Sequence, residues 1–213
     1  MKTDDLIKAL VADTATHEPP VARTVGLAVA GGVVVAAAVF LWLLGLRSDF
    51  GHAITHDPRF MFKFVFTLGV AIPAFLLVRR LARPDGDVGA LRWWLALPLI
   101  LLAAAVLIEM YVVPPDHWSV SAMGSMPVAC MQNIPLLAFA PLVAVLYALR
   151  NGAPANPLAA GAAAGLFSAA IGGACYAMFC VDDSPMFFAI WYIIGMAIVT
   201  AIGAIVGSKI LKW

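Results

Sequence analysis

Residues 172–192 read GGACYAMFCVDDSPMFFAIWY, and this stretch holds the end of one apolar segment, a short polar turn and the start of the next segment. The turn runs only from Cys180 to Pro185. So short a connection between two long apolar segments predicts a tight hairpin of membrane helices. If the turn lies outside the membrane, Cys180 is a thiol facing that compartment, and Cys130 can be placed at the same depth.

The composition sets the class of protein. Hydrophobic residues make up 63% of the 213-residue chain, charged residues 12%, and the mean hydropathy is +0.98. These values lie outside the range of soluble domains and predict a polytopic membrane protein. Three cysteines without a CxxC pair exclude the usual thiol-redox motif and a four-thiol zinc site within one chain. No constellation of nucleophile, base and oxyanion donors is evident, so we predict a protein that is not an enzyme.

Six apolar segments are each about long enough for the roughly 20 residues that a helix needs to cross a bilayer. They are residues 24–46, 60–78, 91–113, 127–149, 156–179 and 186–208. The predicted fold is therefore an all-α membrane protein, a six-helix transmembrane bundle over residues 23–213. Gly161 and Gly165 in the fifth segment, and Gly203 and Gly207 in the sixth, have the GxxxG spacing that allows close helix packing.

The first 20 residues are polar and do not resemble a cleavable signal peptide. They predict a short amphipathic helix, which Pro19 and Pro20 end before the membrane. Thr3 can cap this helix, and Asp4 and Asp5 suit the positive end of its dipole. Its apolar face consists of Leu6, Ile7, Leu10 and Val11.

The basic residues predict the orientation in the membrane. Ten of the thirteen Lys and Arg residues fall on the side of the N-terminus: Lys2, Lys8, Arg23, Arg79, Arg80, Arg83, Arg92, Arg150, Lys209 and Lys212. Arg47, Arg59 and Lys63 fall on the other side. The positive-inside rule then puts both termini in the cytoplasm.

Two interpretations of Cys130 and Cys180 are open. They are either small apolar side chains at helix ends or a pair of thiols that neighbouring helices bring within disulfide or metal-bridging range. Cys175 lies five residues before Cys180, on another part of the helix, and is read as a packing residue.

Further candidate metal ligands lie in the same predicted turns. His52 and His56 have the i, i+4 spacing of one helical face, and His117 and Asp182 could face the same space. Together with the thiols of Cys130 and Cys180 they would suit zinc, cadmium or copper(I), against the alternative that the loop histidines are simply solvated. This hypothesis requires no cofactor, because the bound metal ion would act as a signal.

Glu109 is a carboxylate inside an apolar segment, which makes it a functional candidate unless its side chain reaches the membrane interface. Gln132 and Asn133 are read as groups that form hydrogen bonds between helices.

Three stretches resemble one family: MKTDDLIKALVADT at residues 1–14, CMQNIPLLAFAPLVAVLYALRNGAP at 130–154 and YAMFCVDDSPMFFAIWY at 176–192. With the six-helix body, they are similar to the NrsF family of bacterial membrane anti-sigma factors. The resemblance implies an inner-membrane protein that holds an extracytoplasmic-function sigma factor inactive and releases it under metal or oxidative stress. It also implies a sensing role for Cys130 and Cys180. Val181 stands where the family pattern would have Pro, a difference that concerns the shape of the turn.

We therefore expect residues 1–22 to bind the sigma factor, through Thr3, Asp4, Leu6, Ile7, Leu10 and Val11, and the bundle to act as the sensor. Its partners would be the sigma factor and the lipid bilayer, without direct binding of nucleic acid, and assembly with further copies of the chain stays open. The competing class is a small metal-binding membrane transporter, which a chain of charged groups across the bilayer would indicate. A thiol oxidoreductase is disfavoured by the missing CxxC.

Overall fold

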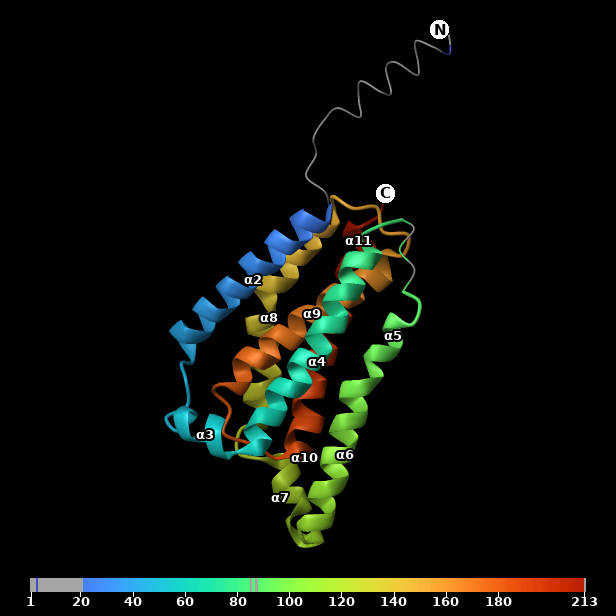
Figure 1. The fold of residues 1–213 in the computed structure, drawn as a ribbon. Coiled ribbons are helices and arrows are strands. Elements are labelled where there is room, and N and C mark those ends of the chain that lie inside the picture. Colours follow the sequence, from blue (N-terminus) through green and yellow to red (C-terminus); the bar gives the residue numbers. More distant parts are fainter. Residues whose placement is uncertain (1–2, 4–20, 85, 87, 213) are drawn as a thin grey trace.

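The computed structural model describes residues 3, 21–84, 86 and 88–212, and all regular structure in these residues is helical. Six of the described segments are long and apolar enough to cross a membrane: Arg23–Leu43, Pro58–Leu81, Leu91–Val112, Pro115–Leu149, Pro157–Ala177 and Pro185–Ile210. These match the six predicted segments, with ends that differ by a few residues, except that the fourth is extended at its start by short helical turns. Figure 1 shows them as one elongated bundle.

The elements follow in chain order. They are α2 (Val21–Leu43), α3 (Phe50–His56), α4 (Pro58–Leu81), α5 (Leu91–Trp94), α6 (Ala96–Val112), the 3₁₀ turn η1 (Pro115–His117), α7 (Trp118–Met123), α8 (Pro127–Leu149), α9 (Pro157–Ala177), α10 (Pro185–Phe187), the π-helical turn η2 (Phe188–Tyr192) and α11 (Ile193–Ile210).

The N-terminal ends of the long helices are encoded locally. Proline occupies the first turn of α4, α8, α9 and α10, where its missing N–H costs no helical hydrogen bond. The side chains of Asp57, Asn156 and Ser184 cap α4, α9 and α10 by accepting backbone N–H groups. The chain therefore enters these helices at fixed residues.

Helix α9 is the centre of the bundle and packs against α4, α8 and α11. In a membrane-length window of this helix 67% of the residues are buried, against 17% in Leu91–Val112. Its many Ala and Gly residues explain this position, because small side chains let helices approach on several sides. A Cβ added to Gly172 would lie 2.6 Å from the carbonyl oxygen of Ile134 in α8.

The glycine pairs predicted from the GxxxG spacing pack against each other, as expected. A Cβ built on Gly203 would lie 2.8 Å from the Cα of Gly165, and one on Gly161 would lie 2.8 Å from the Cα of Gly207. We call these four residues the glycine seam. Here the backbones of α9 and α11 are in direct contact.

The two ends of the bundle differ. The start of α2 and the end of α11 lie at one end, which we call the terminal end (Figure 1). The opposite end, the turn end, carries α3, α7 and the turn of residues 180–185 (Figure 1). The sequence predicts only polar turns where α3 and α7 lie. Helices of seven and six residues are too short to show a periodic pattern.

Candidate functional site

The turn of residues 180–185 is fixed at both of its ends. Helix α9 ends at Ala177, and the Ser184 hydroxyl accepts the N–H of Phe187 at 3.4 Å to start α10. Pro185 sets the first helical residue. Between these two ends Cys180, Asp182 and Asp183 are each held by other parts of the chain.

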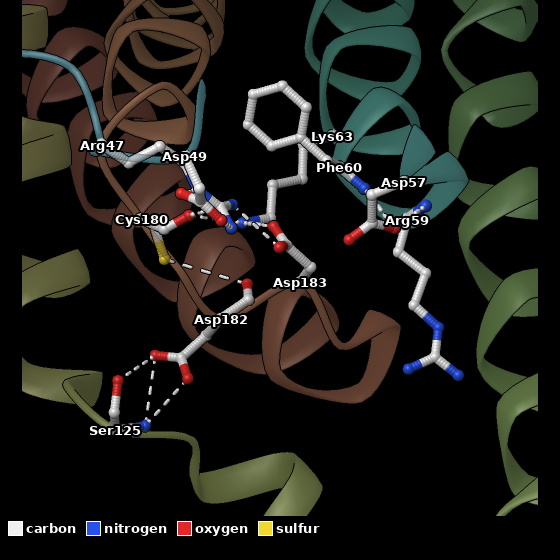
Figure 2. Close-up of polar contacts among 10 residues, drawn as sticks. All are labelled: Arg47, Asp49, Asp57, Arg59, Phe60, Lys63, Ser125, Cys180, Asp182 and Asp183. Atoms are coloured by element: carbon white, nitrogen blue, oxygen red, sulfur yellow. Dashed lines mark hydrogen bonds and ion pairs between the residues drawn. The ribbon is translucent and has the colours of Figure 1, made fainter. Parts of the chain in front are cut away.

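Asp183 lies at the centre of an ion network. Its carboxylate is 2.6 Å from the Lys63 ammonium of α4 and 2.8 Å from the guanidinium of Arg47, which follows α2. Arg47 also pairs with Asp49 at 2.6 Å. The Lys63 side chain is only 1% exposed, so its ammonium is removed from water and its attraction to this carboxylate offsets part of the cost of burial. Figure 2 shows these side chains converging on the turn.

The same cations bind the backbone of Cys180. Its carbonyl oxygen accepts a hydrogen bond from the Lys63 ammonium at 3.0 Å and from Arg47 Nη1 at 3.4 Å. Arg47 also donates its backbone N–H to the Met178 carbonyl at 3.1 Å. The position of the thiol-bearing residue is therefore tied to α4 and to the segment after α2.

Two further carboxylates fasten the turn to the remaining helices. Asp182 accepts the backbone N–H of Ser125 at 3.0 Å and its hydroxyl at 2.8 Å (Figure 2). Glu109 of α6 accepts the Ser184 hydroxyl at 2.9 Å and the Met186 N–H at 2.8 Å. Glu109 is 3% exposed, so its carboxylate is not solvated at the surface but holds the start of α10.

The structure brings the thiols of Cys130 and Cys180 together. Cys130, at the start of α8, is fully buried, Cys180 is 3% exposed, and both are free thiols in hydrogen-bonding contact with each other. The Cys180 thiol also donates to the Asp182 carbonyl at 3.8 Å. The hydrogen bond from Cys130, and after it the Lys63 ammonium, lower the pKa of the Cys180 thiol below its usual range, against the opposing effect of burial.

Two tyrosines that the sequence reasoning did not single out surround the thiols. The Tyr176 hydroxyl lies beside Cys130, and the Tyr192 hydroxyl lies beside Cys180. Both side chains are fully buried, with ring centroids 5.8 Å apart. Tyr192 ends the π-helical turn η2, a feature that no simple periodicity predicts.

The predicted histidine ligands do not join the thiols. Within the part of the chain that the structure describes, no three His, Cys, Asp or Glu side chains are close enough to hold a metal ion. His52 and His56 stack on each other on α3, with ring centroids 4.6 Å apart, and His117 is exposed in η1. Asp182 is engaged with Ser125 instead. Of the six predicted ligands, only the two cysteines are brought together at their thiols.

Other predicted residues have plainer surroundings. Cys175 is buried, as expected of a packing residue. Asn133 donates to the carbonyl of Ala129 in its own helix at 2.9 Å, so this hydrogen bond does not join two helices. The buried charged side chains of the described chain, Lys63 and Glu109, both contact the turn end, so they do not form a path across the bundle.

Of the predicted sigma-binding residues, only Thr3 is described, as an exposed residue in helical conformation. Asp4, Leu6, Ile7, Leu10 and Val11 lie outside the described residues.

Comparison with known proteins adds the family to this geometry. The sequence profile of NrsF, described as negative regulator of sigma F, matches residues 10–213. The chain belongs to the NrsF family. This confirms the resemblance to the family that the sequence predicts.

Two curated NrsF proteins are similar over their full length. The probable anti-sigma-F factor NrsF of Azospira oryzae is 32% identical over 214 residues, covering 100% of both chains. The anti-sigma-F factor NrsF of Caulobacter vibrioides is 34% identical over 218 residues, again covering 100% of both. No solved structure matches the chain. Membership in a family of regulators confirms that the NrsF chain is not an enzyme.

Proposed function

We propose that this NrsF protein is an anti-sigma factor of the bacterial inner membrane. It holds an extracytoplasmic-function sigma factor inactive and releases it when a metal ion or an oxidant reaches Cys130 and Cys180. The observation that carries this proposal is the full-length similarity to two anti-sigma-F factors. The paired thiols of Cys130 and Cys180, at the turn of residues 180–185, are the sensor in this proposal.

The distribution of charge supports the orientation. Arg79 and Arg80 lie in the last turn of α4, and Lys209 lies in the last turn of α11. These basic residues gather at the terminal end, which the positive-inside rule assigns to the cytoplasm. The thiols at the turn end then face the periplasm, and the N-terminal segment faces the compartment where a sigma factor is found.

The partner-binding surface combines several parts of the chain. A single helix of about 14 residues buries less than a standard interface of about 1,600 Å² in total. Residues 1–22 therefore bind the sigma factor together with the loops of residues 79–92 and 150–155, which lie at the same end of the bundle (Figure 1).

The turn connects the sensor to the bundle. Its residues are bound by Arg47, Lys63, Glu109 and Ser125, which come from four different parts of the chain. A change at the sulfur atoms that displaces the turn strains these contacts together. A coupling of about 1–3 kcal/mol between the thiol site and the partner site, typical of allosteric proteins, is enough to change the occupancy of the sigma factor.

The test is co-purification of the sigma factor from host membranes with full-length protein and with a variant that lacks residues 2–13. We expect the truncated protein to insert in the membrane and to lose the sigma factor, because its main binding segment is gone. Sigma factor retained by the truncated protein would contradict the proposed binding site. A Cys130→Ser, Cys180→Ser protein is the matched control for the sensor: it should bind the sigma factor and retain it on exposure to cadmium or peroxide.

A further inference from the structure

A groove in the bundle lies beside the segment of residues 91–112, which holds α5 and α6. Its volume is about 470 Å³, and side chains of α4, α6, α9 and α11 line it together with Leu95 between α5 and α6. Sites for small ligands commonly have volumes of about 300–1,000 Å³. Residues 91–112 are the least buried of the six described spans and lie along one edge of the bundle (Figure 1). Leu99, in the lining, is 53% exposed, so the groove is open to the surroundings of the bundle.

The lining accepts hydrocarbon and offers no partner to a polar ligand. Among the described residues that line the groove, Thr200 has the only polar side chain, and its hydroxyl donates to the Met196 carbonyl of its own helix at 2.8 Å. A polar group placed here would lose its hydrogen bonds to water without replacement. Three small side chains of α11 leave the space, those of Ala197, Ala201 and Ala204. A flexible apolar chain fits this surface.

Basic side chains lie beyond one end of the groove. Arg92 lies three residues before Leu95, about one helical turn away, and Lys209 lies five residues after Ala204. Both lie toward the terminal end of the bundle (Figure 1). Both side chains are exposed, and within the described chain neither forms an ion pair with a carboxylate. An anion at this end of the groove would therefore meet two positive charges.

Two tryptophans lie at the level of these charges. Trp93 and Trp94 are 68% and 65% exposed, and the Arg92 guanidinium lies 5.5 Å from the centroid of the Trp93 ring. Tryptophan is enriched where a membrane meets water. The basic end of the groove therefore matches the depth of lipid headgroups.

A second copy of the chain fits the groove less well than a lipid does. Copies in one membrane insert in the same direction, so a helix of the second copy would bring its own basic end beside Arg92 and Lys209. Like charges would then repel each other. An anionic lipid brings the opposite charge to the same place, and arginine forms strong charge-assisted hydrogen bonds to phosphate.

We propose that the groove binds an acyl chain of an anionic phospholipid, whose phosphate group pairs with Arg92 and Lys209. The acyl chain lies against Ala197 and Ala201 and fills the space between α6 and α11. The inference rests on the membrane location in the proposed function, but it uses neither the sigma factor nor the thiols.

The experiment measures lipid binding to the full-length protein in detergent by native mass spectrometry, with phosphatidylglycerol and with phosphatidylcholine of the same acyl chains. We expect one phosphatidylglycerol to bind more tightly than phosphatidylcholine. Arg92→Gln and Lys209→Gln should each bind phosphatidylglycerol about fivefold more weakly, the usual contribution of one basic residue at an anionic membrane surface. Arg23→Gln is the matched control with wild-type affinity, because Arg23 is an exposed arginine of α2, on the opposite edge of the bundle (Figure 1).

Filling the groove tests the acyl chain separately from the headgroup. The double variant Ala197→Leu, Ala201→Leu should bind both lipids about tenfold more weakly, because the added side chains occupy the space of the acyl chain. Ala30→Leu, at an exposed position of α2, should bind lipid as the wild type does. Thermal unfolding at the wild-type temperature shows that the double variant is folded.

Equal affinity of the wild type for the two lipids would overturn the inference, and so would wild-type affinity of both charge variants or of the double leucine variant. Competition by glycerophosphoglycerol, the headgroup without acyl chains, would also overturn it. A dimer of the wild type that the double leucine variant abolishes would assign the groove to a second copy instead. If the lipid binds as expected but no sigma factor co-purifies, the groove stands and the proposed function fails.

Discussion

Helices α9 and α11 are held together in two different ways along their length. In the glycine seam their backbones touch, with a Cβ on Gly203 placed only 2.8 Å from the Cα of Gly165. At the turn end the connection between them is held by ion pairs, hydrogen bonds and two free thiols. One contact depends on shape alone, and the other depends on charge and on sulfur chemistry.

The difference separates a rigid region from an adjustable one. A glycine contact has no ionisable or reactive group, so no change in solution chemistry alters it. The turn end is held by groups whose charge or bonding state can change, Cys180 and Asp183 among them. A sensor placed at the turn end can therefore change the packing there while the glycine seam keeps the helices in register.

Removing the central counterion should have the largest effect. Asp183→Ala leaves the Lys63 ammonium buried without its carboxylate, which typically costs about 3–5 kcal/mol of unfolding free energy. Thermal or denaturant unfolding in detergent measures the loss. The control is Lys63→Met combined with Asp183→Asn, which removes both charges and should lose less than Asp183→Ala alone. Equal stability of Asp183→Ala and wild type would show that the ion network does not hold the turn.

Filling the glycine seam should have the next largest effect. Gly203→Ala places a Cβ against the Gly165 backbone, and overpacking of this kind costs about 1–3 kcal/mol because a backbone cannot move aside as a side chain can. Gly31→Ala is the matched control, since nothing lies within 4 Å of its added Cβ. Unfolding of both variants under the same conditions gives the comparison. Equal unfolding stability of Gly203→Ala and Gly31→Ala would show that the two helices are not in backbone contact.

Neutralising Glu109 should have the smallest effect. Glu109→Gln keeps an acceptor for the Met186 N–H and the Ser184 hydroxyl but removes the charge that strengthens both bonds, a loss of about 0.5–1.5 kcal/mol. Glu109→Ala removes the acceptor itself and should lose more. The same unfolding measurement separates them. Identical losses for the two variants would show that the charge, rather than the acceptor, holds the start of α10.

Much of the fold could be predicted from the chain alone. Apolar segments of membrane length are continuous in sequence, so the six helices and the tight turn were predicted, and the GxxxG spacing indicated the glycine seam. The pairing of Cys130 with Cys180 was one of two open readings. Lys63 lies inside the apolar run FMFKFVF, a pattern that indicates a buried charge. In the sequence it supported only the predicted orientation in the membrane.

The sequence by itself determined the helices, their order and the grouping of basic residues toward one end, because each depends on neighbouring residues and on side-chain hydrophobicity. Only the tertiary structure decided which polar groups meet. Asp183 could have faced the histidines as readily as Lys63, and nothing in the local pattern placed Tyr176 and Tyr192 beside the thiols. Contacts between residues from different helices depend on helix rotation and depth, which the packing of the whole bundle sets.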